Sequence, residues 1–524
     1  MMFSRGDDLL PRTGKTRQWE EMDWTQRLPE ISRNSRLARA AWMLVAVLIS
    51  WLHLFVHTVG IRSSDLPLDD ASTWGVARQG LGRLFTLPTE FHSQPPLYYF
   101  ILHFLLPINS SPWFLRGISW FFCWMLILFV LFYWHEVSLW ARVCFSLLFI
   151  FSSLTDYLST AVRPYGLASF LTFVASIMLL RLLSDPSFRR GRNYFLWATP
   201  MLYTMAFEVA VLMVHGLVVV AAAIAALLRL PRPEALRRCK IGGLTMGALV
   251  LVYLPYLLLA YHYQYKPNPV ASLNRILLVK TYADILQAML GFAPSLFLGL
   301  IALACLGIVA KFRQGDGRVL LWPLMIVIPI AFVCYFIIGR SPIGAQHKYM
   351  LPALLAFCAL IALGLEQFRP QREFWLVLIV WLAIVIDAHF QPFHRSMTDQ
   401  PEIGQFTILH RELMTFPGKK LIFFNVGYDG QHLEYVTRND PNVLYGTMRG
   451  SHWASGGDNH LDDDYIVRTV EKNRQDCRCF FYHHPTANGP YARAFVPTME
   501  RNGYRPTCSL PAVWGQRVVG YCRD

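Results

Sequence analysis

Two adjacent acidic residues stand in the first long polar stretch of an otherwise apolar chain. Asp69 and Asp70 open the run Asp-Asp-Ala-Ser-Thr-Trp, which follows Pro67 and precedes a stretch with helix-forming composition. A carboxylate in this position can cap a helix, because it accepts free amide protons at the helix start and is kept ionised there. A carboxylate held in this way can also take a proton from an acceptor hydroxyl. Capping and catalysis are compatible, and both acids are candidate catalytic residues.

Cations near the apolar runs form a second set of candidates. Arg163 is followed by Pro164, which predicts the start of a helix directly after the arginine. A cation at the membrane surface can stabilise the charge that develops on a departing lipid phosphate. It can equally be an interfacial side chain that reaches toward lipid headgroups. The candidate phosphate-binding residues are His92, Arg163, Arg340, His347 and Lys348.

Three tyrosines adjoin these groups and are predicted to line the substrate pocket: Tyr98, Tyr165 and Tyr349. The sequence has no Gly-rich phosphate loop and no clear set of metal ligands. We therefore predict no cofactor and no metal site, although a divalent cation is compatible with the chemistry.

The elements that must position these residues are membrane helices. Of 524 residues, 54% are hydrophobic and only 16% are charged, whereas a soluble chain usually carries about a quarter charged residues. Apolar runs near 20 residues, the length that a hydrocarbon layer of about 30 Å requires, predict eleven spans. They are 38–60, 113–134, 139–157, 165–183, 194–210, 211–230, 241–261, 286–310, 319–338, 349–366 and 373–389. The apolar stretch 97–108 is short for a span, and we expect a helix on the membrane surface.

The net charge of +14 follows the membrane topology. With 97–108 outside the membrane core, the Arg-rich loops near residues 181–192, 229–240 and 311–318 all fall on one side. Short basic loops favour the cytoplasmic side. We therefore predict a cytoplasmic N-terminal tail (1–36), a transmembrane domain (37–392) with an outside loop (61–112), and an outside C-terminal domain (393–524). This distribution of charge argues against a nucleic-acid partner.

The C-terminal segment is predicted to have an α/β fold. Strands are predicted at 421–426, 478–483 and 517–522, and helices near 429, at 461–473 and at 492–502, which implies a small parallel or mixed sheet. His483 and His484 are expected to end a strand. Four cysteines lie here: Cys477, Cys479, Cys508 and Cys522. In an oxidising compartment they suggest two disulfides with three possible pairings; four free thiols are the alternative.

The motifs resemble those of a known family. Asp69-Asp70-Ala71-Ser72-Thr73-Trp74, His92 with Pro95-Pro96-Leu97-Tyr98-Tyr99, Arg163-Pro164-Tyr165 and Lys348-Tyr349 occur in the order found in the C-type (GT-C) glycosyltransferases. The likeness covers about residues 38–390 and is to the superfamily of protein O-mannosyltransferases and lipid A aminoarabinose transferases. It implies a GT-C fold with juxtamembrane helices in the first outside loop. It also assigns the base to Asp69 and places Asp70 where the family has Glu. Lys348 stands where the family usually has Arg, so it lacks the bidentate fork of arginine.

This resemblance implies a membrane glycosyltransferase of the cell inner membrane with a periplasmic C-terminal domain. The expected reaction moves a sugar, with inversion, from a polyprenyl-phosphate donor to a hydroxyl or phosphate on a lipid, glycan or protein acceptor. A polytopic transporter and a non-catalytic glycan-export partner are the alternatives. Glu208 and His215, seven residues apart in apolar sequence, indicate either a polar cavity or a buried structural pair.

Overall fold

The structure is a computed structural model. It describes residues 36–61, 66, 68–86, 88–89, 94–264, 294–333, 349–368, 405–416, 418–424, 440, 442–447, 463–484, 492–513 and 516–523. The predicted span 373–389 and the helix expected near residue 429 lie outside the described residues.

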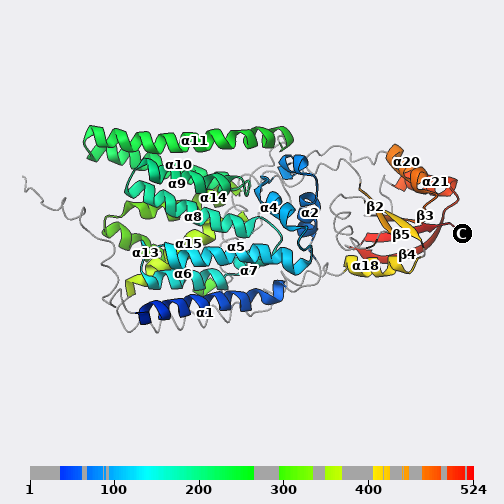
Figure 1. Ribbon diagram of the computed structural model, residues 1–524, viewed down its shortest axis with the longest axis horizontal. Coiled ribbons are helices and arrows are strands. Elements are labelled where there is room, and N and C mark those ends of the chain that lie inside the picture. The colour runs from blue at the N-terminus through cyan, green and yellow to red at the C-terminus, as the bar shows by residue number, and fades with distance from the viewer. Residues whose placement is uncertain are drawn as a thin grey trace, which may run out of the picture. The chain divides into compact units, whose positions relative to one another are not determined.

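Most of the chain before residue 369 that the structure describes is helical (Figure 1). Five of these helices are long and apolar enough to cross a membrane: α1 (Arg36–Ile61), α5 (Pro112–Tyr133), α8 (Tyr165–Ser184), α10 (Glu208–Arg229) and α11 (Arg232–Gln264). The bent pair α6 (Leu139–Phe151) and α7 (Ser153–Thr160) makes a sixth if it counts as one span. The remaining long helices are α9 (Phe188–Leu202), α13 (Pro294–Arg313), α14 (Leu321–Val333) and α15 (Leu351–Leu365). The chain is therefore a multi-pass membrane protein.

The centre of the helical bundle is formed by α8 and α15. Every residue of α15 is buried, and this helix packs against α6, α8, α13 and α14. α8 packs in addition against α5, α9 and α10. The backbones of α13 and α15 approach so closely that a Cβ at Gly364 would collide with the carbonyl group of Leu303. Small residues permit this kind of approach between membrane helices.

The bounds of several predicted spans differ from those of the observed helices. The span predicted at 139–157 breaks at Ser152, whose backbone is extended, and α6 and α7 meet there at 75°. The boundary predicted at 210/211 lies earlier, because α9 ends at Leu202 and α10 begins at Glu208. Hydropathy measures whether a run is apolar, so it cannot locate the turn between α9 and α10. At Ser152 the sequence becomes polar, but hydropathy does not tell a bend from the end of a span.

Three short helices follow α1: α2 (Leu68–Ala77), the 3₁₀ helix η2 (Leu81–Phe85) and α4 (Leu97–Leu105). The nine residues of α4 extend about 14 Å at 1.5 Å per residue, too short to cross a hydrocarbon layer. This agrees with the prediction that the stretch 97–108 is not a span. α2 packs on α4, where Val76, Leu84 and Tyr99 form a small buried cluster.

The C-terminal segment contains a small mixed sheet, as predicted. Its strands are β1 (Lys419–Phe424), β2 (Val443–Thr447), β3 (Cys477–His484), β4 (Arg505–Val513) and β5 (Gln516–Cys522), in the order β2-β1-β3-β5-β4. β1 is parallel to β2 and β3, and β5 is antiparallel to β3 and β4. Its helices are α18 (Gln405–Met414), α20 (Asp463–Asn473) and α21 (Ala492–Arg501). The sequence did not predict α18, β2 or β4.

The expectation of two disulfides is wrong. Cys479 and Cys522 face each other across β3 and β5 and are bonded, whereas Cys477 and Cys508 are free thiols. A bulge in β3 next to Lys419 and Lys420 places Cys477 in the hydrophobic cluster on one face of the sheet. Cys508 packs against the cluster on the opposite face. A bulge reverses which face the side chains occupy, so these two thiols cannot meet.

Candidate active site

The acidic motif and the Arg-Pro-Tyr motif meet although ninety residues separate them. Nη1 of Arg163 donates a hydrogen bond to Oγ1 of Thr73, on α2, at 2.9 Å. Arg163 is only 5% exposed. It therefore does not extend to the surface in the manner of an interfacial arginine. Pro164 precedes the first residue of α8, as predicted.

The Pro-Pro-Leu-Tyr-Tyr motif joins the same site through a serine. Oγ of Ser119, on α5, donates to the backbone carbonyl of Arg163 at 3.3 Å and lies 3.1 Å from the hydroxyl of Tyr98. Because Ser119 has one proton to give, the Tyr98 hydroxyl must be the donor to Ser119. Burial raises the pKa of Tyr98 above its ordinary value, and the charges of Asp70 and Arg163 also act on this hydroxyl. Tyr98 is therefore a neutral hydrogen-bond donor.

Asp70 lies in the first turn of α2 and is 2% exposed. Asp69 precedes it in the same turn, and its side chain is not among the described parts of the structure. Both acids follow the first residue of the helix, so they lie inside its first turn. The positive end of the helix dipole favours ionised carboxylates there.

The short helices are tied to each other and to the bundle by hydrogen bonds. Nδ1 of His103, on α4, lies 2.8 Å from the carbonyl oxygen of Ala77, the last residue of α2. The amide of Leu97 donates to the carbonyl of Tyr203 at 3.0 Å. Oε1 of Gln94 accepts from the amide of Ala206 at 3.1 Å. The turn between α9 and α10 therefore fixes the segment that leads into α4.

Tyr349, of the Lys348-Tyr349 motif, also contacts the turn between α9 and α10. The ring of Tyr349 lies 4.6 Å from that of Phe207, centroid to centroid. Tyr349 is partly buried and precedes α15. His92, Arg340, His347 and Lys348, the other predicted phosphate-binding residues, lie outside the described residues.

Tyr165 is the first residue of α8 and is fully buried, with its ring 5.7 Å from that of Tyr157. Within the described residues its hydroxyl has no hydrogen-bond partner. A buried hydroxyl without a partner is unfavourable, so this atom is suited to a polar group of a ligand. The three predicted pocket tyrosines thus lie on α4, on α8 and next to α15, around the same end of the bundle.

Comparison with known proteins identifies the fold of this chain. No family model matches the sequence, and no curated protein matches it. Among solved structures, the chain is similar to ArnT from Cupriavidus metallidurans in the apo state, with a TM-score of 0.58. The likeness covers 92% of this chain and 98% of that chain at 13% sequence identity. The chain has the fold of ArnT. At this identity the likeness is one of fold, and it confirms at that level the fold class expected from the motifs.

The ArnT-like bundle also contains a pair of a buried histidine and a partly buried aspartate that the sequence did not reveal. Nδ1 of His57, in α1, lies 3.0 Å from Oδ1 of Asp156, in α7. The ring of His53 stands one turn earlier and contacts His57 edge to face, with centroids 4.7 Å apart. Ionisable residues in an apolar span are candidate functional residues by default. His53 and His57 could therefore have been identified as candidates from the sequence. The pair connects α7, which leads directly to Arg163, to α1.

Glu208 and His215 belong to one polar line along α8. Oγ1 of Thr172 donates to Oε2 of Glu208 at 2.7 Å. Ser176, one turn further along α8, lies 3.2 Å from Nε2 of His215, whose Nδ1 is 2.9 Å from the Tyr194 hydroxyl. All of these side chains are buried. His215 is therefore satisfied on both nitrogens, as a structural residue would be, whereas Oε1 of Glu208 has no partner within the described residues.

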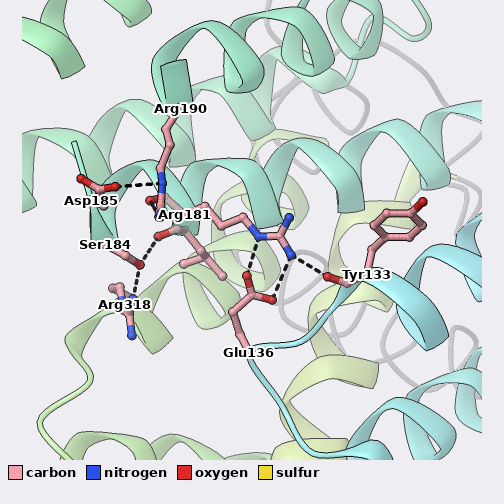
Figure 2. Close-up of polar contacts among 8 residues, drawn as sticks. Tyr133, Glu136, Arg181, Ser184, Asp185, Arg190 and Arg318 are labelled. Carbon is pink, nitrogen blue, oxygen red and sulfur yellow. Dashed lines mark hydrogen bonds and ion pairs between the residues drawn. The ribbon is translucent and has the colours of Figure 1, made fainter. Parts of the chain in front are cut away.

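The opposite end of α8 carries ion pairs (Figure 2). Nε of Arg181 donates to Oε1 of Glu136 at 2.5 Å, and its Nη2 donates to the carbonyl of Tyr133. Nε of Arg190 lies 3.2 Å from Oδ2 of Asp185. Arg318 bonds both Asp316, at 2.7 Å, and the hydroxyl of Ser184. These side chains are partly or fully exposed, and they connect α5, α8, α9 and the turn before α14.

No group of three or more His, Cys, Asp or Glu side chains in the described part of the chain is placed to hold a metal ion. Among the described residues, those that meet at the candidate site offer the carboxylate of Asp70, the buried guanidinium of Arg163 and the phenol of Tyr98. Such a set can accept a proton, stabilise a negative charge and hold hydroxyl groups.

Proposed function

We propose that the chain is an inverting glycosyltransferase of a bacterial inner membrane. It transfers a sugar from a polyprenyl-phosphate donor to a hydroxyl acceptor on a lipid, glycan or protein. The observation that carries this proposal is the hydrogen bond between Thr73 and Arg163. It joins the motif with the candidate base to the motif with the candidate phosphate ligand, within a fold like that of ArnT.

In the proposed reaction, Asp69 takes the proton of the acceptor hydroxyl. The acceptor oxygen then forms a bond to the anomeric carbon, while the bond from that carbon to the phosphate oxygen breaks. The lipid phosphate leaves as a monoester and carries the electron pair. Attack opposite to the leaving group inverts the anomeric centre, and the reaction needs neither a nucleotide nor a metal.

The buried arginine suits the leaving group. A guanidinium that stands away from water acts more strongly on a developing phosphate charge than an exposed one does. The bonds from Arg163 to Thr73 and from Ser119 to the Arg163 carbonyl fix it before the substrate arrives. Lys348, Arg340, His347 and His92 are proposed to complete the phosphate site. Tyr98, Tyr165 and Tyr349 are proposed to line the sugar pocket, with Asp70 beside the base.

The proposed domain organisation follows the sequence: a cytoplasmic tail (1–36), a transmembrane catalytic domain (37–392) and a periplasmic α/β domain (393–524). The eleven spans and the outward orientation of the candidate site belong to this proposal. The charge of the loops supports them, because the exposed arginines near residues 181–192 and 229–240 lie at the end of α8, α9 and α10 opposite to Arg163.

The test compares envelope lipids and glycoproteins by mass spectrometry in cells with the gene, without it, and with Asp69→Asn. We expect one sugar-modified species to disappear in the deletion strain. In the Asp69→Asn strain, the rate at which this species forms should fall by about 10²–10⁴-fold. Glu234→Gln is the matched control, because Glu234 forms an exposed pair with Arg238 on the surface of α11. Unchanged glycans together with altered uptake of a solute would instead establish a transporter.

A further inference from the structure

One edge of the C-terminal sheet carries a group of arginines. Because β3 and β4 both run antiparallel to β5, the first residues of β3 and β4 meet the last residues of β5 at one edge (Figure 1). Four exposed arginines lie at or next to these strand ends: Arg474, Arg478, Arg505 and Arg523. None of these residues is part of the candidate active site.

Hydrogen bonds hold the backbone at this edge. The amide of Arg523 donates to the carbonyl of Arg478 at 3.0 Å, and Nε of Arg478 lies 3.4 Å from the carbonyl oxygen of Arg523. The hydroxyl of Tyr504, which is buried, lies 3.1 Å from the carbonyl oxygen of Arg474 and 3.0 Å from that of Cys477. Tyr504 therefore joins the turn before β3 to the start of β4.

A hollow of about 540 Å³ opens between these strand ends. Its lining is formed by Glu500, Gly503, Tyr504, Arg505, Pro506 and Arg523. Pockets for small ligands usually measure about 300–1,000 Å³. The hollow is thus large enough for a monosaccharide with a charged group.

In the described part of the chain, no ion pair neutralises the arginines around the hollow. Within the described residues, the side chains of Arg474, Arg505 and Arg523 form no ion pair and no hydrogen bond. Lys419, at the same edge, does pair with Asp476 at 3.6 Å. Burial raises the pKa of Tyr504, whereas the neighbouring guanidinium groups of Arg523 and Arg474 act in the opposite direction. The hollow therefore attracts anions, and among its described lining residues Glu500 supplies a carboxylate as an acceptor group.

We propose that this hollow binds a phosphorylated saccharide. The phosphate lies against Arg505 and Arg523, because a guanidinium can bind phosphate oxygens in a bidentate manner. A sugar hydroxyl donates to Glu500. An anion alone would be repelled by this carboxylate, whereas a sugar phosphate uses both kinds of group. The proposal concerns binding to the C-terminal domain and does not depend on the reaction proposed above.

The test is calorimetric titration of the full-length protein in detergent at low ionic strength, with glucose 1-phosphate, inorganic phosphate and glucose as separate probes. We expect glucose 1-phosphate to bind more tightly than either component. Arg505→Gln and Arg523→Gln should each weaken its binding by about tenfold or more, since each removes charge-assisted hydrogen bonds. Glu500→Gln should weaken the binding of glucose 1-phosphate but should not weaken the binding of inorganic phosphate.

Arg411→Gln is the control, because Arg411 is an exposed arginine of α18 that does not line the hollow. Arg505→Lys, which keeps the charge but loses the fork, should bind with intermediate affinity. The proposal is overturned if glucose 1-phosphate does not bind. It is also overturned if Arg411→Gln weakens the binding of glucose 1-phosphate as much as Arg505→Gln does. It is also overturned if inorganic phosphate binds as tightly and Glu500→Gln has no effect on the sugar phosphate.

Discussion

The two ends of α8 use arginine in opposite ways. At the end where α8 stops, Arg181, Arg190 and Arg318 pair with carboxylates and remain accessible to water. Figure 2 shows the pairs of Arg181 and Arg190. At the end where α8 starts, Arg163 is almost fully buried, and its guanidinium donates to the neutral hydroxyl of Thr73. An exposed pair contributes little to stability because water and salt screen it. A buried guanidinium is costly to desolvate, so Arg163 depends on the polar groups packed around it at this end of α8.

The largest effect is expected from Arg163→Gln. Removing a preorganised donor to a developing negative charge usually lowers the rate by about 10²–10³-fold. We expect a loss of this size in kcat/KM for sugar transfer, measured by mass spectrometry with purified protein. Arg163→Lys should retain part of the activity, because it keeps the charge. Full activity in Arg163→Gln would contradict the proposal that Arg163 binds the leaving phosphate.

Thr73→Val tests how the buried arginine is positioned. The substitution removes the hydroxyl that accepts from Arg163, and a hydrogen bond to a charged group is worth about 1.5–3 kcal/mol. We expect kcat/KM to fall by at least about tenfold, and Thr73→Ser to restore it. Equal activities of the Val and Ser variants would show that the bond to Thr73 does not position Arg163 for the reaction.

Gly166→Ala tests the packing that supports the same end of α8. A Cβ at residue 166 would collide with the backbone carbonyl of Ser119, so α5 and α8 must separate. Overpacking of this kind costs about 1–3 kcal/mol, and both Tm and activity should fall. Gly117→Ala, on α5 at the same end, meets open space and serves as the control. Equal melting temperatures for the two variants would contradict the close approach of the helices.

Arg181→Gln should have the smallest effect. Its pair with Glu136 is partly exposed, and such pairs contribute about 0–1 kcal/mol. We expect Tm to change little, the change to shrink further at high salt, and transfer activity to stay within about twofold of wild type. A loss of activity comparable to that of Arg163→Gln would show that the two ends of α8 are coupled.

Parts of the site were predictable from local sequence. Pro164 predicted the start of α8, and the adjacent acids predicted the first turn of α2, because capping and proline geometry depend on neighbouring residues only. The short length of α4 followed from its apolar run. In the C-terminal domain, β3 and β5 were predicted from their apolar stretches, whereas β2 and β4 were missed. β4 contains two prolines, Pro506 and Pro511, which are unusual within strands.

The break at Ser152, the turn at 203–207 and the unpaired cysteines were not predictable from these local signals. The turn interrupts apolar sequence, where hydropathy has little contrast. Ser152 lies where apolar sequence gives way to polar sequence, and a fall in hydropathy does not distinguish a bend from the end of a span. The pairing of Cys479 with Cys522 needs the order of the strands, and the exclusion of Cys477 needs the bulge in β3.

The sequence by itself determined the membrane class, the order of the motifs and the residue types available for chemistry, because these follow from composition and from neighbours along the chain. Only the tertiary structure decided that Arg163 is buried against Thr73, that Ser119 links Tyr98 to Arg163, and that Phe207 brings Tyr349 to the same end of the bundle. Hydrogen bonds and ring contacts between distant residues depend on how helices pack, and local periodicity carries no information about that packing.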